Sequence, residues 1–398
     1  MLYSREIFEQ AKKLLLKDEC IILTGARQTG KTSILIMLKN FLEIKKNQPC
    51  FYFNLENQDY LKLLNKHPYN IFELIPNSKV KQTIIIDEIQ YLDDPTNFLK
   101  LLYDEKRDQV KIIASGSSSF YIDKKFKDSL VGRKVLLEVY PLNFTEFLVF
   151  NDEDDLIKQK SKTLSVYYKN KLKKLWDKYL IYGGYPKVVL EGKNNAQIVI
   201  LQDIVSSYIK KDIRDAGIKN TDKYFALLKI LASQTGELVN SQELANTLNM
   251  AHKTVEEYLY VMKKSYQVAF IRPFYRNARK ELSKMPKVYF YDLGFRNLLL
   301  NDFDFLDKRQ DKGAYLENVI FKEFLRQFGN INLINFWRTQ DKKEVDFVID
   351  SKEAFEVKFV ASQIKKKKYE AFKNFYPNIK LSFLEYSKVL EKFYKWKL

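Results

Sequence analysis

The sequence predicts an α/β fold built from several domains. In the N-terminal third, short apolar runs alternate with helical patterns, as in a parallel sheet covered by helices. Three helical patterns and a strand-like run follow in the middle, and a helix with three strand-like runs lies near the C-terminus. With 398 residues, 46% of them hydrophobic, the chain can form about two to four domains.

The composition excludes several classes of protein. Cys20 and Cys50 cannot build a disulfide framework, and with two histidines they give no Cys/His cluster at zinc-ligand spacing. The sequence contains no uncharged apolar stretch of about 18 residues, and its start is amphipathic and mixed in charge. We therefore expect a soluble, cytoplasmic protein that does not bind membranes.

A phosphate-binding loop lies between a predicted strand and a predicted helix. The apolar run IILTG leads into GARQTGKT, which has the pattern G-x-x-x-x-G-K-[ST], and then into a helical pattern. In such loops the backbone N–H groups hold phosphates, the lysine reaches the β- and γ-phosphates, and the hydroxyl binds Mg²⁺. The predicted ATP-binding residues are Gly25, Ala26, Arg27, Gln28, Thr29, Gly30, Lys31, Thr32 and Ser33, and Thr32 is also a predicted Mg²⁺ ligand.

Two acids end the second predicted strand, in the run QTIIIDEIQYL. A buried parallel strand carries Asp87 to the carboxyl edge of the sheet, beside the phosphate-binding loop. We expect Asp87 to bind Mg²⁺ through water, and Glu88 to act as the general base that polarises the attacking water.

A third strand, VKIIASGSSSF, ends in small hydroxyl residues. Ser115, with Ser117 as the second choice, is predicted to sense the γ-phosphate, although a serine here is also typical of a helix cap or a turn. Arg133 follows a glycine in SLVGRKV. It is either a surface charge or an arginine finger that completes the site of a neighbouring subunit.

The ordered motifs LTGARQTGKT, IIIDEIQ, ASGSSS, SLVGRKV, PLNFTEF and YGGYP resemble those of the AAA-type ATPases of archaea and bacteria that carry a C-terminal domain of unknown function similar to restriction endonucleases. The resemblance covers nearly the whole chain. It implies a P-loop ATPase core, a small helical lid, a winged helix-turn-helix and a nuclease-like tail. The corresponding ranges are 1–150, 151–220, 221–275 and 276–398.

Positive charge is concentrated in the second part of the chain. The formal net charge is +18, and almost all of the excess follows residue 160, with one concentration within residues 261–290. Because Glu256 and Glu257 on the third helix of the predicted winged helix would repel phosphates, we do not expect this helix to recognise a base sequence in the major groove. We expect the lysines of the helix and the arginines that follow it to hold the phosphate backbone of a nucleic acid. Packing or subunit contact is the alternative role. The predicted contacts are Lys253, Lys263, Lys264, Arg272, Arg276 and Arg279.

The tail carries the pattern D-x(9)-E-x-K, formed by Asp346, Glu356 and Lys358, and Glu317 lies on the preceding helix. A period of two places Glu356 and Lys358 on one face of a strand. This is the core pattern of PD-(D/E)xK nucleases, in which the three acids hold Mg²⁺ and the lysine orients or activates water. Cleavage, nucleic-acid binding without cleavage, and packing all remain open for this tail.

The sequence thus predicts an ATPase that uses ATP and Mg²⁺, binds nucleic acid, DNA more than RNA, and remodels or cleaves it. We expect either a homo-oligomer or a protein partner. The alternative is a signalling or scaffold ATPase whose nucleotide state controls assembly with a protein partner, with an inactive nuclease-like domain.

Overall fold

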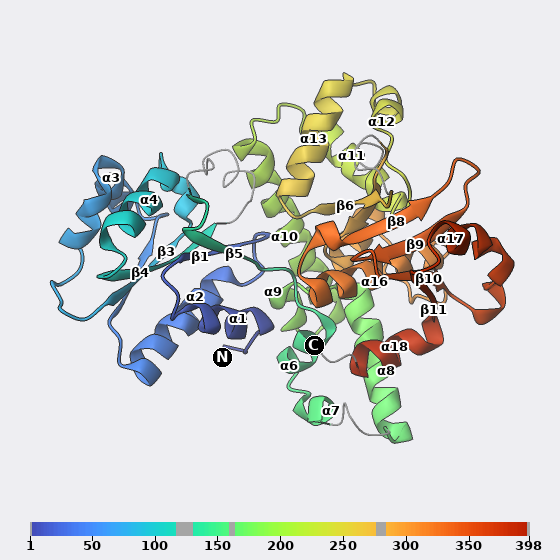
Figure 1. The fold of residues 1–398 in the computed structure, drawn as a ribbon, viewed down its shortest axis with the longest axis horizontal. Helices are drawn as coiled ribbons and strands as arrows, with labels where there is room; N and C mark the ends of the chain where they lie inside the picture. Colours follow the sequence, from blue (N-terminus) through green and yellow to red (C-terminus); the bar gives the residue numbers. More distant parts are fainter. Residues whose placement is uncertain (1, 117–129, 159–163, 276–283, 396–398) are drawn as a thin grey trace. The chain divides into compact units, whose positions relative to one another are not determined.

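The computed structural model describes residues 2–116, 130–158, 164–275 and 284–395 (Figure 1). Its contacts divide the chain into two units. The first unit comprises Met1–Tyr140 together with the short segment Lys264–Tyr266, and the second comprises Pro141–Lys263 and Gln267–Leu398.

The first unit is built on a five-stranded parallel sheet with the order β2-β3-β4-β1-β5. The strands are β1 (Cys20–Thr24), β2 (Cys50–Asn54), β3 (Gln82–Asp87), β4 (Val110–Gly116) and β5 (Lys134–Glu138). The helices are α1 (Glu6–Leu14), α2 (Lys31–Asn40), α3 (Gln58–Lys66) and α4 (Pro95–Lys106), with shorter turns η1 (Phe41–Lys45), η2 (Pro68–Glu73) and η3 (Ile89–Tyr91).

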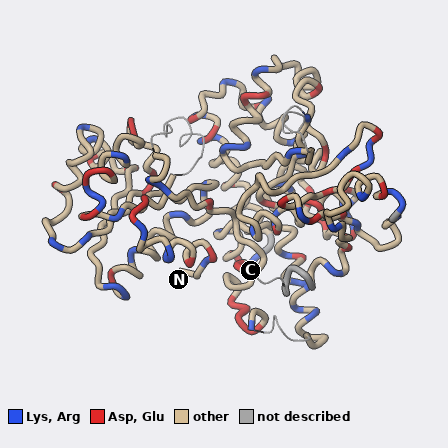
Figure 2. Tube along the Cα trace, in the orientation of Figure 1, with Lys and Arg blue, Asp and Glu red and all other residues tan. Residues whose placement is uncertain are grey.

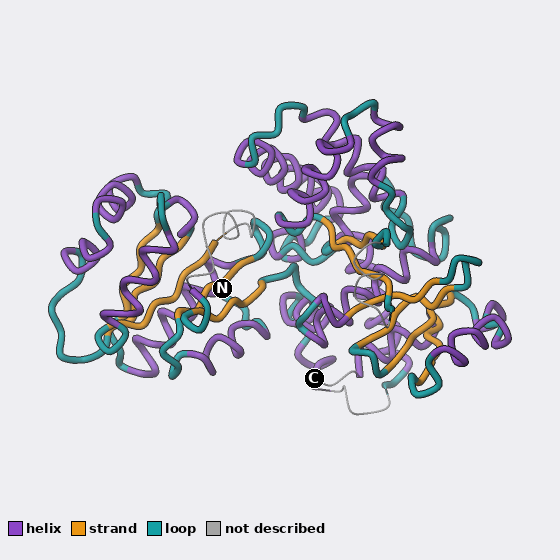
Figure 3. Tube along the Cα trace, turned by 45° about the horizontal axis from the view of Figure 1, so that its top comes forward, coloured by secondary structure: helices purple, strands orange, loops and turns teal. Residues whose placement is uncertain are grey.

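Both faces of this sheet are buried, as the continuous apolar runs predict. On β3, Ile84 and Ile86 pack on one side in a cluster with Phe98 of α4, whereas Ile85 packs on the other side with Leu35 of α2. Figure 3 shows the strands of the unit lying between its helices. Because the strands are parallel, the residues that follow β1, β3 and β4 meet at one edge of the sheet.

The second unit contains most of the helices that the structure describes. The helices before its sheet are α6 (Phe144–Phe150), α7 (Asp154–Lys158), α8 (Val166–Tyr182), α9 (Pro186–Val189), α10 (Asn194–Asp215), α11 (Thr221–Ser233), α12 (Ser241–Leu248) and α13 (His252–Lys264). The later ones are α15 (Leu293–Leu300), α16 (Lys312–Phe328), α17 (Glu370–Phe375) and α18 (Tyr386–Lys395), with η5 (Ile331–Leu333), η6 (Ala361–Gln363) and η7 (Lys366–Tyr369).

A six-stranded mixed sheet runs through the second unit in the order β11-β10-β9-β8-β6-β7. Its strands are β6 (Val268–Pro273), β7 (Lys287–Phe290), β8 (Ile334–Arg338), β9 (Glu344–Ile349), β10 (Glu353–Lys358) and β11 (Lys380–Glu385). β6 pairs with β7 in antiparallel fashion and with β8 in parallel fashion. The hairpin that follows α13 therefore continues directly into the sheet of the tail, and this sheet spans the expected domain boundary at residue 275. The division into four domains stays a prediction.

The glycines of the YGGYP motif allow a close approach within the second unit. Gly183 has a φ of +79°, and a Cβ there would lie 2.2 Å from Oδ1 of Asp292. The Asp292 carboxylate accepts a hydrogen bond from the backbone N–H of Gly184 at 2.7 Å. Together these contacts join the end of α8 to the start of α15, so a side chain at Gly183 would force them apart.

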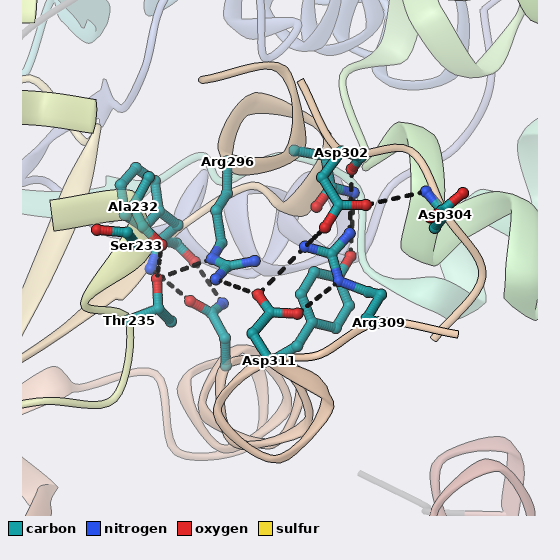
Figure 4. A network of polar contacts seen from close by, with 12 residues as sticks. Ala232, Ser233, Thr235, Arg296, Asp302, Asp304, Arg309 and Asp311 are labelled. Carbon is teal, nitrogen blue, oxygen red and sulfur yellow. Dashed lines mark hydrogen bonds and ion pairs between the residues drawn. The ribbon is translucent and has the colours of Figure 1, made fainter. Parts of the chain in front are cut away.

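A buried ionic network joins α15 to α16 in the second unit (Figure 4). The Asp311 carboxylate accepts hydrogen bonds from Arg296 at 2.6 Å and from Arg309 at 2.8 Å, and both arginines are buried. Arg296 also donates to the Thr235 hydroxyl at 2.8 Å, and Arg309 pairs with Asp302 at 2.9 Å. The Asp311 carboxylate therefore balances part of the positive charge of both Arg296 and Arg309.

None of the helices in the described ranges is both long enough and apolar enough to cross a membrane. Cys20 and Cys50 are free thiols buried in the first unit. Burial raises the pKa of each thiol to about 12.

Candidate functional site

The loop between β1 and α2 has the backbone shape that phosphate binding needs. Gly25 has a φ of +147°, and a Cβ there would lie 2.2 Å from the carbonyl oxygen of Val139. Gln28 and Gly30 also have positive φ values, of 59° and 92°. A chain with these turns presents successive N–H groups to one side, at the N-terminus of α2.

Side chains of the first unit hold this loop in place. Arg5, which is buried, donates a 2.7 Å hydrogen bond to the carbonyl of Thr29, and the Thr29 hydroxyl donates to the carbonyl of Ala26 at 2.8 Å. The Lys31 ammonium donates to the carbonyls of Gly25 and Ala26, at 2.9 and 2.7 Å. Lys31 is buried and is oriented along the loop by these bonds.

The remaining predicted ATP-binding side chains lie around the same loop. Ala26 and Thr29 are buried and Arg27 is half-buried. Gln28, Thr32 and Ser33 are exposed. The structure therefore places all the predicted loop residues at one end of β1, as the local strand, turn and helix pattern predicts.

Asp87 is the point on which the polar groups of this edge converge. Its Oδ2 atom accepts hydrogen bonds from the hydroxyls of Thr32 and Tyr52, each at 2.7 Å. Its Oδ1 atom accepts a hydrogen bond from the Ser115 hydroxyl. Residues from α2, β2 and β4 thus bind one carboxylate at the end of β3. The structure brings Thr32, Asp87 and Ser115 together, and their roles toward Mg²⁺ and the γ-phosphate stay predictions; Ser117 lies outside the described residues.

Tyr52 was not among the residues predicted from the sequence. It lies on β2, which pairs with β3 so that Asn54 is opposite Asp87. Burial, followed by the hydrogen bond to Asp87, raises the pKa of the Tyr52 hydroxyl. The apolar context of the run CFYFN gives no sign of this contact, because it depends on which strand lies beside β3.

Glu88 adopts a backbone conformation that is uncommon for a residue with a side chain. Its φ is +58°, and its N–H lies 3.2 Å from both Asp87 Oδ1 and Ser115 Oγ. The Glu88 carboxylate accepts a hydrogen bond from the side chain of Gln90. Such conformations cost about 1–3 kcal/mol and are concentrated at functional sites, where the surrounding contacts maintain them.

This edge of the sheet fits a Mg²⁺–nucleotide complex. The hydroxyl of Thr32 and the carboxylate of Asp87 are oxygen ligands of the kind that Mg²⁺ prefers, and they lie 2.7 Å apart beside the loop. Mg²⁺ usually takes only one or two protein ligands and completes its shell with phosphate oxygens and water. The glycine at position 25 lets the loop start directly against the backbone of Val139, which leaves no room for a Cβ.

Arg133 lies at the other edge of the same sheet. Its carbonyl accepts a hydrogen bond from the N–H of Cys20, at the start of β1, whereas the phosphate-binding loop follows the end of β1. The Arg133 guanidinium pairs with Asp104 at 2.6 Å. Arg133 is therefore no part of the site in its own chain, and its action on a neighbouring subunit stays a prediction.

The segment Lys264–Tyr266 brings a further hydroxyl to the first unit. The Tyr266 hydroxyl lies 2.9 Å from Oγ1 of Thr24, the last residue of β1, and donates a 3.0 Å hydrogen bond to Glu138 of β5. Tyr266 is buried and has a φ of +58°. It follows α13 directly in the chain, a connection that the sequence pattern does not indicate.

The tail brings together the four residues that the D-x(9)-E-x-K pattern predicts. The Lys358 ammonium donates to the Glu356 carboxylate and lies 3.9 Å from Oδ2 of Asp346. That Asp346 oxygen accepts a 2.7 Å hydrogen bond from the N–H of Val357. Burial, followed by repulsion from Asp346, raises the pKa of Glu356 to about 7 and that of Glu317 to about 8.

Two further residues belong to this group and were not predicted. Glu344 lies two residues before Asp346 on β9, and Lys287 begins β7. The Lys287 ammonium lies 2.6 Å from Glu344, 3.5 Å from Glu317 and 4.0 Å from Asp346. We call Glu317, Glu344, Asp346 and Glu356 the carboxylate cluster.

The carboxylate cluster does not fit the metal ion that the sequence pattern predicts. Within the described ranges, no group of three or more His, Cys, Asp or Glu side chains is arranged to hold a metal. The carboxylates of Glu317 and Asp346 are directed instead at the ammonium groups of Lys287 and Lys358. The sequence places Lys287 in a basic stretch, whereas the structure buries it at 2% exposure.

The predicted nucleic-acid contacts are only partly described. Lys253, Lys263 and Arg272 are exposed and Lys264 is half-buried. Arg276 and Arg279 lie outside the described residues. Glu256 and Glu257 of α13 are exposed as well, and acidic residues interrupt the basic ones in this part of the chain (Figure 2).

Comparisons with known proteins agree with this site in the first unit. Residues 17–148 match a family described as an AAA domain. Residues 173–305 match a domain of unknown function (DUF8612), and residues 312–391 match another domain of unknown function (DUF4143).

The chain is also similar, over most of its length, to uncharacterized proteins. An uncharacterized protein of Haemophilus influenzae is 26% identical over 352 residues, which cover 85% of this chain and 81% of that protein. An uncharacterized protein of Methanocaldococcus jannaschii is 25% identical over 378 residues, which cover 92% of this chain and 81% of that protein.

Two solved structures show weaker likenesses. The Thermotoga maritima RuvB Holliday junction branch migration motor has a TM-score of 0.35 at 15% identity, covering 71% of this chain and 95% of that chain. AMPPCP-bound DnaA from Aquifex aeolicus has a TM-score of 0.34 at 18% identity, and the match covers 65% of this chain and 89% of that chain. Such TM-scores carry no argument about function. Residues 17–148, which match the AAA family, contain the phosphate-binding loop and the parallel sheet of the first unit, as an AAA-type P-loop ATPase domain requires.

Proposed function

We propose that this protein hydrolyses ATP with Mg²⁺ and uses the reaction to bind and remodel nucleic acid, DNA more than RNA. The observation that carries the hydrolytic part is the convergence of Thr32, Tyr52 and Ser115 on Asp87, beside the phosphate-binding loop. ATPases of this class need a metal-binding carboxylate and a hydroxyl at these two places.

Each residue of the site has a separate role in this proposal. The loop N–H groups and Lys31 bind the phosphates and neutralise the charge that develops on them. Thr32 and Asp87 hold Mg²⁺, which supplies further charge neutralisation when bound. Glu88 orients the attacking water and accepts its proton, while Ser115, which donates to Asp87, senses the γ-phosphate.

Arg133 can act as an arginine finger only if the protein forms an oligomer. Because Arg133 lies at the opposite edge of its own sheet, it can reach a phosphate only in a neighbouring subunit. There its guanidinium would stabilise the charge on the transferred phosphoryl group. We therefore propose a homo-oligomer in which neighbouring subunits complete each other's sites.

Residues 221–290 support the nucleic-acid part of the proposal. α11, α12 and α13 are followed by the β6–β7 hairpin, which is the element order of a winged helix. Lys253 and Lys263 are exposed on α13, and Arg272 is exposed on β6. Glu256 and Glu257, also exposed on α13, would repel phosphates if this helix entered a groove, so we assign the contacts to the phosphate backbone to the exposed basic residues and no base recognition to α13. We also propose that residues 151–220 form the helical lid and residues 276–398 the nuclease-like tail, the ranges that the sequence predicts.

Salt-dependent binding tests this part of the proposal against the alternative. Labelled duplex DNA, single-stranded DNA and RNA are titrated at 50–300 mM salt, with and without a non-hydrolysable ATP analogue. A basic surface that releases several counterions gives a steep log–log slope, and Lys253→Ala or Arg272→Ala lowers that slope by about one each. Lys100→Ala, an exposed lysine of α4, is the matched control. A slope near zero would instead support a signalling or scaffold ATPase that binds a protein partner.

A further inference from the structure

The position of Lys287 follows from its strand. β7 pairs with β6 so that Lys287 lies opposite Ile271, and alternate residues of a strand point to the same face. Lys287 and Tyr289 therefore share a face, and the Tyr289 hydroxyl lies 3.3 Å from Glu317. This face of β7 is directed at the carboxylate cluster.

The Lys287 ammonium lies among carboxylates from two other elements. Its nearest partner is Glu344 of β9 at 2.6 Å, followed by Glu317 of α16 at 3.5 Å and Asp346 of β9 at 4.0 Å. The ring of Phe336 lies 5.5 Å from the same nitrogen. Three carboxylates directed at one buried cation form the arrangement that a divalent ion would otherwise stabilise.

The charges of the cluster are nearly compensated by side chains alone. The four carboxylates of the carboxylate cluster face three cations, the side chains of Lys287, Lys358 and Arg338. Lys358 pairs with Glu356 and lies near Asp346, and Arg338 pairs with Glu344. The remaining polar partners are hydroxyls, since Tyr369 donates to Glu356 at 2.7 Å and Tyr289 to Glu317. A divalent ion added to this set would have to displace a buried ammonium.

We propose that the ammonium of Lys287 takes the place of a divalent metal ion among Glu317, Glu344 and Asp346, so that the cluster is a permanent ionic core of the second unit rather than a nuclease centre. An ammonium is neither a Lewis acid nor able to activate a bound water, which the predicted cleavage requires. Its function is to hold β7, α16 and β9 together. The tail then serves as a scaffold or binding surface rather than as a nuclease.

Manganese binding tests this proposal on the full-length chain. All proteins carry Asp87→Asn and contain no nucleotide, so that the ATPase site does not contribute. Bound Mn²⁺ is measured from the loss of the free-ion resonance, and the melting temperature is recorded with and without Mn²⁺. With Lys287 intact, we expect no Mn²⁺ bound in the micromolar range and no change in melting temperature.

Lys287→Met removes the ammonium while keeping the length of the side chain. We expect this variant to melt at a lower temperature, to bind one Mn²⁺ per chain, and to recover part of its melting temperature when Mn²⁺ is added. Adding Asp346→Asn should abolish that binding. Lys111→Met, which removes a buried lysine of the first unit, is the control and should gain no Mn²⁺ site.

Two results would overturn the proposal. One is a Mn²⁺ ion bound per chain with Lys287 intact and lost in Asp346→Asn, a result that decides the matter even if Lys287→Met fails to fold. The other is a folded Lys287→Met protein that gains no Mn²⁺ site. ATP hydrolysis is measured separately, on proteins in which Asp87 is restored. This measurement tests the proposed function independently of Mn²⁺ binding by the carboxylate cluster.

Discussion

The hydroxyl of Thr32 donates a 2.7 Å hydrogen bond to Oδ2 of Asp87, which joins the first turn of α2 to the end of β3. The two residues are 55 positions apart, and only the parallel sheet brings them together. Because both are oxygen ligands suited to Mg²⁺, this contact fixes where the metal of a bound nucleotide would lie.

Removing the Tyr52 hydroxyl should slow ATP hydrolysis without unfolding the protein. Tyr52 donates to the same Asp87 oxygen as Thr32, and a hydrogen bond to a charged group contributes about 1.5–3 kcal/mol. We expect Tyr52→Phe to lower kcat about tenfold, which corresponds to the lower end of that range. Steady-state hydrolysis with saturating Mg–ATP is the measurement. Tyr60→Phe, which removes a hydroxyl from the ring pair with Phe53, should leave kcat unchanged. If Tyr52→Phe and Tyr60→Phe hydrolyse ATP at the same rate, the Tyr52 hydroxyl has no role in hydrolysis.

Asp311 should be a determinant of stability in the second unit (Figure 4). Its removal leaves Arg296 and Arg309 buried with one carboxylate fewer between them, and breaking a buried pair costs about 3–5 kcal/mol. Since Asp311 is partly exposed, we expect about 3 kcal/mol for Asp311→Ala, measured by urea denaturation. The exposed Asp304 nearby supplies the control, Asp304→Ala, which should change the free energy of unfolding by less than about 0.5 kcal/mol. Similar losses for both variants would contradict the assigned role.

Cys20 and Cys50 should react with thiol reagents only when the first unit opens. Burial raises the pKa of each thiol to about 12, so at pH 8 the reactive thiolate is rarer than in the unfolded chain by roughly 10³-fold. The time course of modification by a disulfide reagent, with and without denaturant, measures this protection. Between pH 8.5 and 12 the unfolded chain releases these protons first, so the free energy of unfolding should fall as pH rises through that window. Rapid modification of the native protein would show that the thiols are not buried.

The phosphate-binding loop could be predicted from the sequence because its determinants are local. A strand, a glycine-containing turn and a helix lie within about twenty residues, and Lys31 and Thr32 follow from them. Asp87 and Ser115 were also predictable, since the carboxyl ends of parallel strands meet at one edge of the sheet. The local strand–turn–helix pattern and the rule for parallel strands are therefore enough to locate these residues, even when their contacts are unknown.

Tyr52, Tyr266 and Lys287 could not be predicted in the same way. Tyr52 contacts Asp87 only because β2 is the neighbour of β3, and the sequence does not state the order of strands. Lys287 lies in a basic stretch that indicates a solvated surface, yet the pairing of β6 with β8 buries it in the tail. The contacts of such residues depend on pairings between distant segments, which charge and periodicity do not encode.

The most direct test of the account is ATP turnover by Glu88→Gln. As general base, Glu88 should contribute about 10²–10⁴-fold to the hydrolytic step, whereas the amide preserves the size of the side chain. We predict a fall in kcat of at least about 100-fold with unchanged affinity for Mg–ATP, and no change for Glu73→Gln, an exposed residue of the same unit. A Glu88→Gln protein that hydrolyses ATP at the wild-type rate would contradict the assignment of this edge of the sheet as the catalytic site.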